Sequence, residues 1–324
     1  MEDRLSGSWA ASMKTALAAT MAHPAWWVLA LAAFLVRGGF IVVLLPLVSL
    51  PSVPSLATTL APPIEALVLS RQSLEGALIG TVLISTIVGL LAAAGLAGSC
   101  LDLALLREAG AAEELDRKVQ VVEWSWWHAF GVRLAAHLPT FLALGYATVR
   151  IVIVTYEELL SPGDANVPIV ARVLARAPDA IVLVVVTWLL GEAIGGLAAR
   201  RSAAGEPLIR ALRGAVRDLL DRRGVATFVV SNAVVLVAGT LLVTMVGRSS
   251  EHVRAYLLDG AGDVPLAAAL LLLVTTWLLG LAVLGAALAW RTVAWTAATA
   301  PRRALQETGS AADEATAVGG LPAG

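Results

Sequence analysis

Arg37, Glu192 and Asn232 are polar residues that lie deep inside long apolar segments of the chain. An ionisable group at such a depth in a membrane is costly, so it faces protein or water and has a partner. Because an arginine side chain extends several ångströms, we expect an ion pair between Arg37 and Glu192, with Asn232 completing the hydrogen bonds. Two interpretations stay open. The cluster is either a gate or polar site for an anionic group, or a buried ion pair that fixes helix register.

The elements that must position these residues are six apolar segments, which cover residues 26–50, 74–101, 132–155, 180–199, 225–246 and 266–290. Each meets the requirement of about 20 apolar residues for a helix that crosses a bilayer. The chain is 58% hydrophobic and 15% charged, whereas a soluble protein carries roughly 25% charged residues. We therefore predict an all-α, polytopic membrane bundle of six transmembrane helices. Gly38, Gly39 and Pro46 predict that the first of these helices is bent.

The distribution of Arg and Lys predicts the orientation of the chain. With the N-terminus inside, the segments on the inner face hold sixteen of these residues and those on the outer face hold five. The positive-inside rule then places both termini in the cytoplasm. We expect a cytoplasmic N-terminal segment (1–24), a six-helix transmembrane domain (25–295) and a disordered cytoplasmic tail (296–324). The predicted location is a bacterial cytoplasmic membrane.

A short sequence recurs in two of the predicted spans. Thr187-Trp188-Leu189-Leu190-Gly191 reappears as Thr276-Trp277-Leu278-Leu279-Gly280, and both copies lie in spans that run from outside to inside. One interpretation is a fold of three repeated helical hairpins, made of spans 1–2, 3–4 and 5–6. The other is chance similarity between apolar sequences.

The connection between the fourth and fifth spans is amphipathic at helical spacing. In residues 207–223 the apolar side chains fall on one helix face, and Arg210, Arg213 and Arg217 fall on the opposite one. Such a helix lies in the headgroup plane of a bilayer and attracts anionic lipid. We expect these three arginines to contact anionic headgroups at the cytoplasmic face, and residues 115–127 and 291–303 to form similar connecting helices. The alternative is that all three segments are ordinary basic connectors.

Motifs for catalysis and cofactor binding are absent from the sequence. It contains no zinc-protease, phosphate-loop or dinucleotide-binding signature. A single cysteine excludes an internal disulfide. The sequence therefore predicts no enzyme activity, no cofactor, no metal site and no nucleic-acid partner. The expected partners are the lipid bilayer and a membrane protein or a second copy of the chain.

The entry to the first span, His23-Pro24-Ala25-Trp26-Trp27, together with six spans and amphipathic connectors, resembles uncharacterised bacterial six-helix integral membrane proteins. It is also loosely similar to the membrane domain of glycerophosphodiester phosphodiesterases. The resemblance implies a membrane module without the catalytic domain of that family, so no catalytic residue carries over. We expect a non-catalytic scaffold or accessory subunit. The alternative is a small transporter or permease-type subunit with a polar path near Arg37, Glu192 and Asn232.

Overall fold

The fold is described from a computed structural model, which covers residues 9–44, 46–47, 74–112, 126–160, 169–260 and 262–319. Within these residues all regular structure is helical, as the composition predicts. The elements are α1 (Trp9–Ala22), α2 (Pro24–Phe34), the π-helical turn η2 (Leu35–Gly39), α3 (Phe40–Leu44), α5 (Leu74–Ala112), α6 (Trp126–Ala136), α7 (Leu138–Leu160), α8 (Ile169–Arg176), α9 (Pro178–Ala203), α10 (Leu208–Leu220), α11 (Arg222–Leu258) and α12 (Asp263–Gly319).

Five stretches among the described residues are long and apolar enough to cross a membrane: Pro24–Leu44, Leu138–Glu158, Pro178–Ala203, Arg222–Leu258 and Asp263–Ala298. They indicate a membrane protein. Large apolar side chains stay exposed on these helices, which suits a hydrocarbon surrounding. The remaining predicted span, 74–101, is helical throughout as part of α5. Six membrane crossings therefore stay a prediction.

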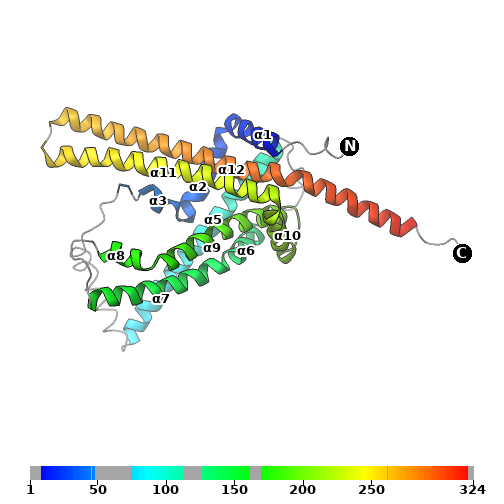
Figure 1. Ribbon diagram of the computed structural model, residues 1–324, viewed down its shortest axis with the longest axis horizontal. Coiled ribbons are helices and arrows are strands. Elements are labelled where there is room, and N and C mark those ends of the chain that lie inside the picture. Colours follow the sequence, from blue (N-terminus) through cyan, green and yellow to red (C-terminus); the bar gives the residue numbers. More distant parts are fainter. Residues whose placement is uncertain are drawn as a thin grey trace.

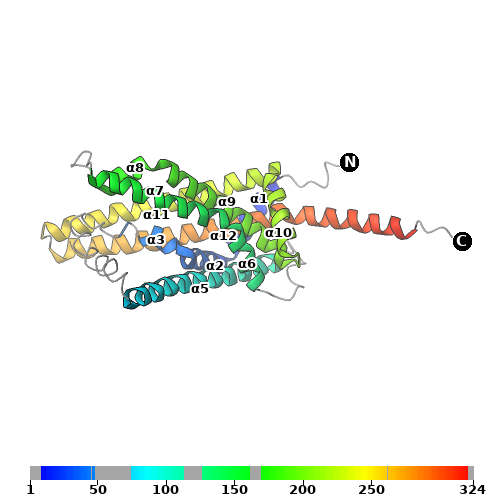
Figure 2. The same ribbon diagram turned by 90° about the horizontal axis from the view of Figure 1, so that it is seen from below.

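Helices of neighbouring predicted spans pack against each other as antiparallel pairs. α2 lies against α5, α6 and α7 lie against α9, and α11 lies against α12 along most of its length (Figure 1). This arrangement suits three hairpins but does not test whether they share an ancestor, so the repeat stays a prediction. Figure 2 shows α5 on one side of the α11–α12 pair and α7 and α8 on the other.

Two breaks bend the helices that position the site. The first predicted span is kinked at η2, where Gly38 has a φ of 102°. The helix α3 that follows therefore does not continue α2 in a straight line. This confirms the predicted bend and explains the glycine, because other residues rarely adopt this φ. The predicted third span, 132–155, is divided between α6 and α7 at His137. Pro139 lacks the amide hydrogen that an unbroken helix would use there.

Both ends of the chain contain helix that the sequence-based description does not include. In the N-terminal segment, α1 packs on α12 and buries Met13, Ala16 and Ala19 in the main apolar core. The tail from residue 296, which we expected to be disordered, continues as helix α12 through Gly319. Each further residue of an existing helix gains a hydrogen bond without a new nucleation cost. For the same reason residues 291–303 belong to α12 and do not form a separate connector. Most of the other connector, 115–127, lies outside the described residues.

The elements at one end of the bundle are α1, α6 and α10, while the turn between α11 and α12 lies at the opposite end (Figure 1). The predicted amphipathic connector is confirmed as α10, which buries Ala211, Ala215 and Leu219. A second apolar core joins α10 to α6 and α9 through Val132 and Leu197. The polar residues discussed next lie where this second core meets the α2–α5–α11–α12 core.

Candidate functional site

Arg37 is held against α5 by the bend at η2. Its Nε donates a hydrogen bond to the Ala33 carbonyl at 3.1 Å, which fixes the guanidinium along its own helix. Its Nη1 lies 2.5 Å from Asp102 Oδ2, and Nη2 lies 3.4 Å from Oδ1. The close approach depends on Gly98, because a Cβ there would lie 2.7 Å from Arg37 Cγ. A small residue on α5 therefore makes room for the arginine.

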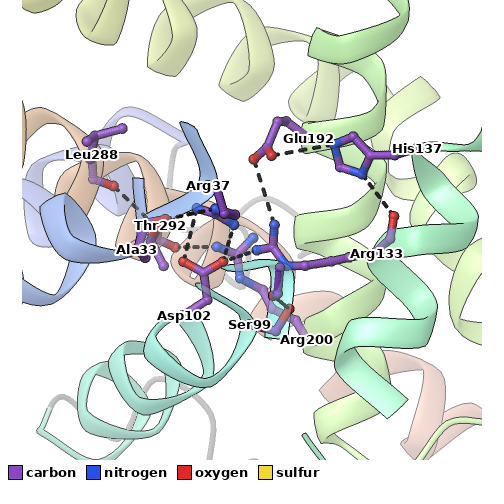
Figure 3. A network of polar contacts seen from close by, with 11 residues as sticks. Ala33, Arg37, Ser99, Asp102, Arg133, His137, Glu192, Arg200, Leu288 and Thr292 are labelled. Carbon is purple, nitrogen blue, oxygen red and sulfur yellow. Dashed lines mark hydrogen bonds and ion pairs between the residues drawn. The ribbon is translucent and has the colours of Figure 1, made fainter. Parts of the chain in front are cut away.

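Asp102 is the central acceptor of the cluster (Figure 3). It is buried on α5 and pairs with Arg133 of α6 as well as with Arg37. A carboxylate that receives two guanidiniums satisfies several of its lone pairs at once. Asp102 thereby joins η2, α5 and α6 at one point.

Glu192 of α9 continues the network on its other side. Its Oε2 lies 3.7 Å from Arg133 Nη1, and its Oε1 lies 3.4 Å from His137 Nε2. His137 stands at the break between α6 and α7, where its Nδ1 lies 2.8 Å from the Arg133 carbonyl oxygen. Gly191 admits the ring, because a Cβ there would lie 2.9 Å from His137 Cδ2. The glycine beside Glu192 thus shapes its contact with the histidine.

The predicted direct pair between Arg37 and Glu192 is wrong. Instead, the contacts run from Arg37 to Asp102, then to Arg133, and then to Glu192 and His137 (Figure 3). The reason is geometric: η2 packs on α5, so Arg37 meets a carboxylate of that helix before it reaches α9. The two ions that link Arg37 to Glu192, namely Asp102 and Arg133, were not predicted.

A cavity of about 40 Å³ brings the three predicted residues together. Arg37, Glu192 and Asn232 all line it, as do Asp102 and Arg133. The rest of the lining includes Arg200, Gly196 and, on α12, Arg291, Thr292 and Trp295. The predicted cluster is therefore one site, although its internal contacts differ from those expected.

Asn232 has a different role from the one expected. Its Nδ2 donates to the Phe228 carbonyl at 2.8 Å, so the amide group bonds to its own helix. It lines the cavity from α11 and makes no hydrogen bond to Arg37 or Glu192. Asn232 is therefore a lining residue of the site and not a partner of Arg37 or Glu192.

Two further arginines reach the cavity, one from the last turn of α9 and one from the middle of α12. Arg200 Nη2 donates to the Thr292 carbonyl at 2.7 Å, which ties these two helices together. Arg291 has neither a hydrogen bond nor an ion pair with any residue that the structure describes, and it is only half buried. Arg133 keeps two buried nitrogens, Nε and Nη1, without a hydrogen-bond partner in the same set of residues. The cavity is therefore rich in unused donors.

Sequence reasoning missed Asp102, Arg133, Arg200 and Arg291 because each lies at or beyond the end of an apolar segment. The helices continue past the apolar segments: α5 extends to Ala112, and α12 extends well beyond residue 290. A search for inward-facing charges therefore has to include the residues just beyond each apolar segment. A charged residue in such an extension still faces the bundle. The described residues contain no group of three or more His, Cys, Asp and Glu that could hold a metal ion.

The predicted lipid contacts, Arg210, Arg213 and Arg217, lie on the exposed face of α10 and not in this cavity. They form a separate surface at the end of the bundle where α1 also lies (Figure 1).

Comparison of the chain with models of protein families, with curated proteins and with solved structures finds no match in any of the three. The fold and the site define a helical membrane protein with a charged cavity. Its activity is inferred from that cavity.

Proposed function

We propose that this chain is a multi-pass protein of a bacterial cytoplasmic membrane that binds a small anion in the cavity around Arg37, Asp102, Arg133 and Glu192, and that it acts as a small transporter or permease-type subunit. The end with α1 and α10 is proposed to face the cytoplasm, on the strength of the Arg and Lys distribution.

The charge of the cavity is the observation that supports this proposal. The guanidiniums of Arg37, Arg133 and Arg291 line the cavity together with two carboxylates, those of Asp102 and Glu192. Arg200 adds a fourth guanidinium, so positive charges outnumber negative charges in the lining. Charged groups inside membrane helices are rare and mark the paths of substrates or ions. A surplus of guanidinium donors favours a carboxylate, a phosphate group or a halide, which accept hydrogen bonds and neutralise the charge.

The location of the cavity agrees with a path through the bundle. Four of the five candidate spans contribute lining residues: Arg37, Glu192, Asn232 and Arg291 each come from a different one. Sites formed between facing helices are the usual arrangement for ligands in helical bundles. A ligand there contacts helices from both halves of the protein.

The size of the cavity limits the ligand. A single buried water needs roughly 10–15 Å³ of such volume, so about 40 Å³ accommodates a few waters or an anion of a few atoms. A larger substrate would require the helices to separate. The proposal is therefore restricted to small anions.

A non-catalytic scaffold is the second candidate, and one observation favours it. The ion pairs of Asp102 and Glu192 join η2, α5, α6 and α9 in one network, which is what a device for fixing helix register would do. In that case the cavity holds water, and no anion binds with measurable affinity.

Anion-dependent stability separates the two candidates. Thermal unfolding of the purified protein in detergent is measured in chloride, phosphate and acetate at constant ionic strength. A bound anion should stabilise the folded state by RT ln(1 + [L]/Kd), or about 2.7 kcal/mol at one hundred times Kd. Arg291→Gln, which breaks no bond among the described residues, should abolish the anion-dependent part only. The control is Arg222→Gln, an exposed arginine at the start of α11.

Transport itself is tested in liposomes. Protein reconstituted into sealed vesicles should accelerate exchange of the stabilising anion, and Arg291→Gln should reduce this exchange. Stabilisation without exchange would support an anion-binding scaffold. If no anion shifts the unfolding temperature of the unmodified protein, the anion-binding proposal is wrong.

A further inference from the structure

An open groove of about 470 Å³ lies between α10 and the helices behind it, away from the charged cavity. Its apolar lining comes from four elements: Ala136 of α6, Pro139 of α7, Ile194 of α9 and Val216 of α10. Its volume falls in the range of roughly 300–1,000 Å³ that is typical of ligand sites. The groove is therefore large enough for a molecule of considerable size and is apolar along its walls.

Two arginines complete the groove on the side of α10. Arg213 and Arg217 both contribute to its lining, and their spacing of four residues places them on the same helix face. Both side chains are exposed, and neither has a hydrogen bond or an ion pair within the described part of the chain. A pair of unengaged guanidiniums beside an apolar groove complements a ligand with one acidic group and one apolar part.

The acidic residues near these arginines are already engaged in fixing α10. Arg201 of α9 donates from Nε to Asp218 Oδ2 at 2.9 Å and from Nη2 to Oδ1 at 3.0 Å. Its Nη1 bonds both oxygens of Glu206, at 2.9 and 3.2 Å. Asp221 Oδ2 accepts from the backbone amide of Arg223 and so begins α11. The contacts of these carboxylates are therefore with α9 and α11.

The wall of the groove is consequently a fixed part of the bundle. The bidentate contact of Arg201 with Asp218 holds α10 on α9, and Gly214 leaves space for it, because a Cβ there would lie 2.4 Å from Arg201 Nη1. An amphipathic helix that only floated on a bilayer would have no such anchor. A site against a rigid wall selects its ligand by shape as well as by charge.

We propose that this groove binds one anionic glycerophospholipid, with the phosphate between Arg213 and Arg217 and an acyl chain along Ala136, Pro139 and Ile194. The phosphate accepts hydrogen bonds from the guanidiniums, as phosphate groups do from arginine pairs. The ligand is a membrane lipid and not free phosphate, because most of the groove is apolar and gains stability only from burying hydrocarbon.

The surface beside the groove supplies the route for such a lipid. Leu138 and Phe141 lie on either side of Pro139 on α7, with more than half of their surface exposed, and α7 is one of the candidate spans. The apolar groove and the apolar face of that span are thus neighbours along the chain. An acyl chain can pass from the bilayer into the groove without crossing a polar barrier.

Native mass spectrometry of the detergent-solubilised protein with added phosphatidylglycerol tests this proposal. We expect one lipid to bind per chain, and phosphatidylcholine to bind more weakly. Arg213→Gln and Arg217→Gln should each weaken binding about five-fold, because an arginine near an anionic headgroup is worth about 1 kcal/mol. Arg210→Gln is the matched control: it removes the same charge from the same helix outside the groove and should leave the affinity unchanged.

A second pair of variants tests the apolar part. Val216→Trp fills the groove while keeping all charges and should weaken binding about ten-fold, the loss expected for about two buried methylene groups. Leu220→Trp adds the same bulk on the same helix at a residue outside the groove lining, 74% exposed, and should have no effect. Circular dichroism confirms that each variant keeps its helices.

Three results would overturn the proposal. Equal loss of lipid from Arg210→Gln and Arg213→Gln would mean that charge attracts lipid without a site. Equal binding of lipid by Val216→Trp and by the unmodified protein would show that no acyl chain lies in the groove. Displacement of the lipid by millimolar glycerol phosphate would show a phosphate site that does not use hydrocarbon.

Discussion

Replacing Asp102 by asparagine should destabilise the protein more than any other single loss of charge in the network. Asn keeps the shape of the side chain and one acceptor, so the change removes mainly the negative charge. Arg37 and Arg133 then face each other without the carboxylate that both contact. Breaking a buried ion pair in this way costs about 3–5 kcal/mol, because the remaining charge is left uncompensated.

The burial of the three groups decides where in this range the value falls. The side chains of Arg37, Asp102 and Arg133 are 18%, 9% and 12% exposed, so water screens them little. Arg133 keeps Glu192 at 3.7 Å as a second carboxylate. We therefore expect a loss near the lower end, about 3 kcal/mol.

Unfolding in a denaturing detergent, followed by the fluorescence of the ten tryptophans, measures this loss. Asp259→Asn is the control, since Asp259 is exposed at the end of α11. In the double variant Asp102→Asn with Arg37→Gln, the loss should be smaller than the sum of the two single losses, because the second change removes an uncompensated charge. A loss below about 1 kcal/mol for Asp102→Asn, or strict additivity in the double variant, would refute the reasoning.

Three further outcomes are expected. Gly98→Leu should lower stability by about 1–3 kcal/mol because it displaces the arginine of η2, whereas Gly89→Leu, with open space around it, should change unfolding little. Arg201→Gln should free α10 and increase its amide hydrogen exchange at least ten-fold, while Arg210→Gln should not; unchanged exchange would show that the ion pairs do not hold the helix. In a Cys100→Ala background, Arg210→Cys should react with an impermeant maleimide from the cytoplasmic side only, and labelling from outside would reverse the proposed orientation.

The helical class and the apolar segments could be predicted from the sequence because hydrocarbon imposes a long and simple pattern. The bend in the first span was predictable too, since Gly38 and Gly39 follow each other there, and the structure places a positive φ at Gly38. The break at His137 was missed although Pro139 signals it. In an apolar segment a proline is a weak stop signal, because neighbouring groups can satisfy the freed backbone.

The candidate site was predicted in its location and not in its contacts. Arg37, Glu192 and Asn232 stand out as polar residues at depth, and all three line one cavity. Asp102 and Arg133 were not assigned because an apolar segment ends before its helix does, so its boundary says little about which charges face inward. Which carboxylate meets which guanidinium depends on helix packing, and one sequence carries no direct record of that packing.

The shared residue between α10 and α11 restricts how this molecule can move. Asp221 is the C-cap of α10 and the N-cap of α11, so no flexible linker separates the two helices. If the long α11–α12 hairpin tilts relative to α9, α10 must move with it, and the contact between Arg201 and Asp218 is strained. Such a tilt would also change the width of the groove on α10. A tilt of the long hairpin is therefore mechanically linked to the arginine-lined groove, and whatever occupies that groove would resist or assist it.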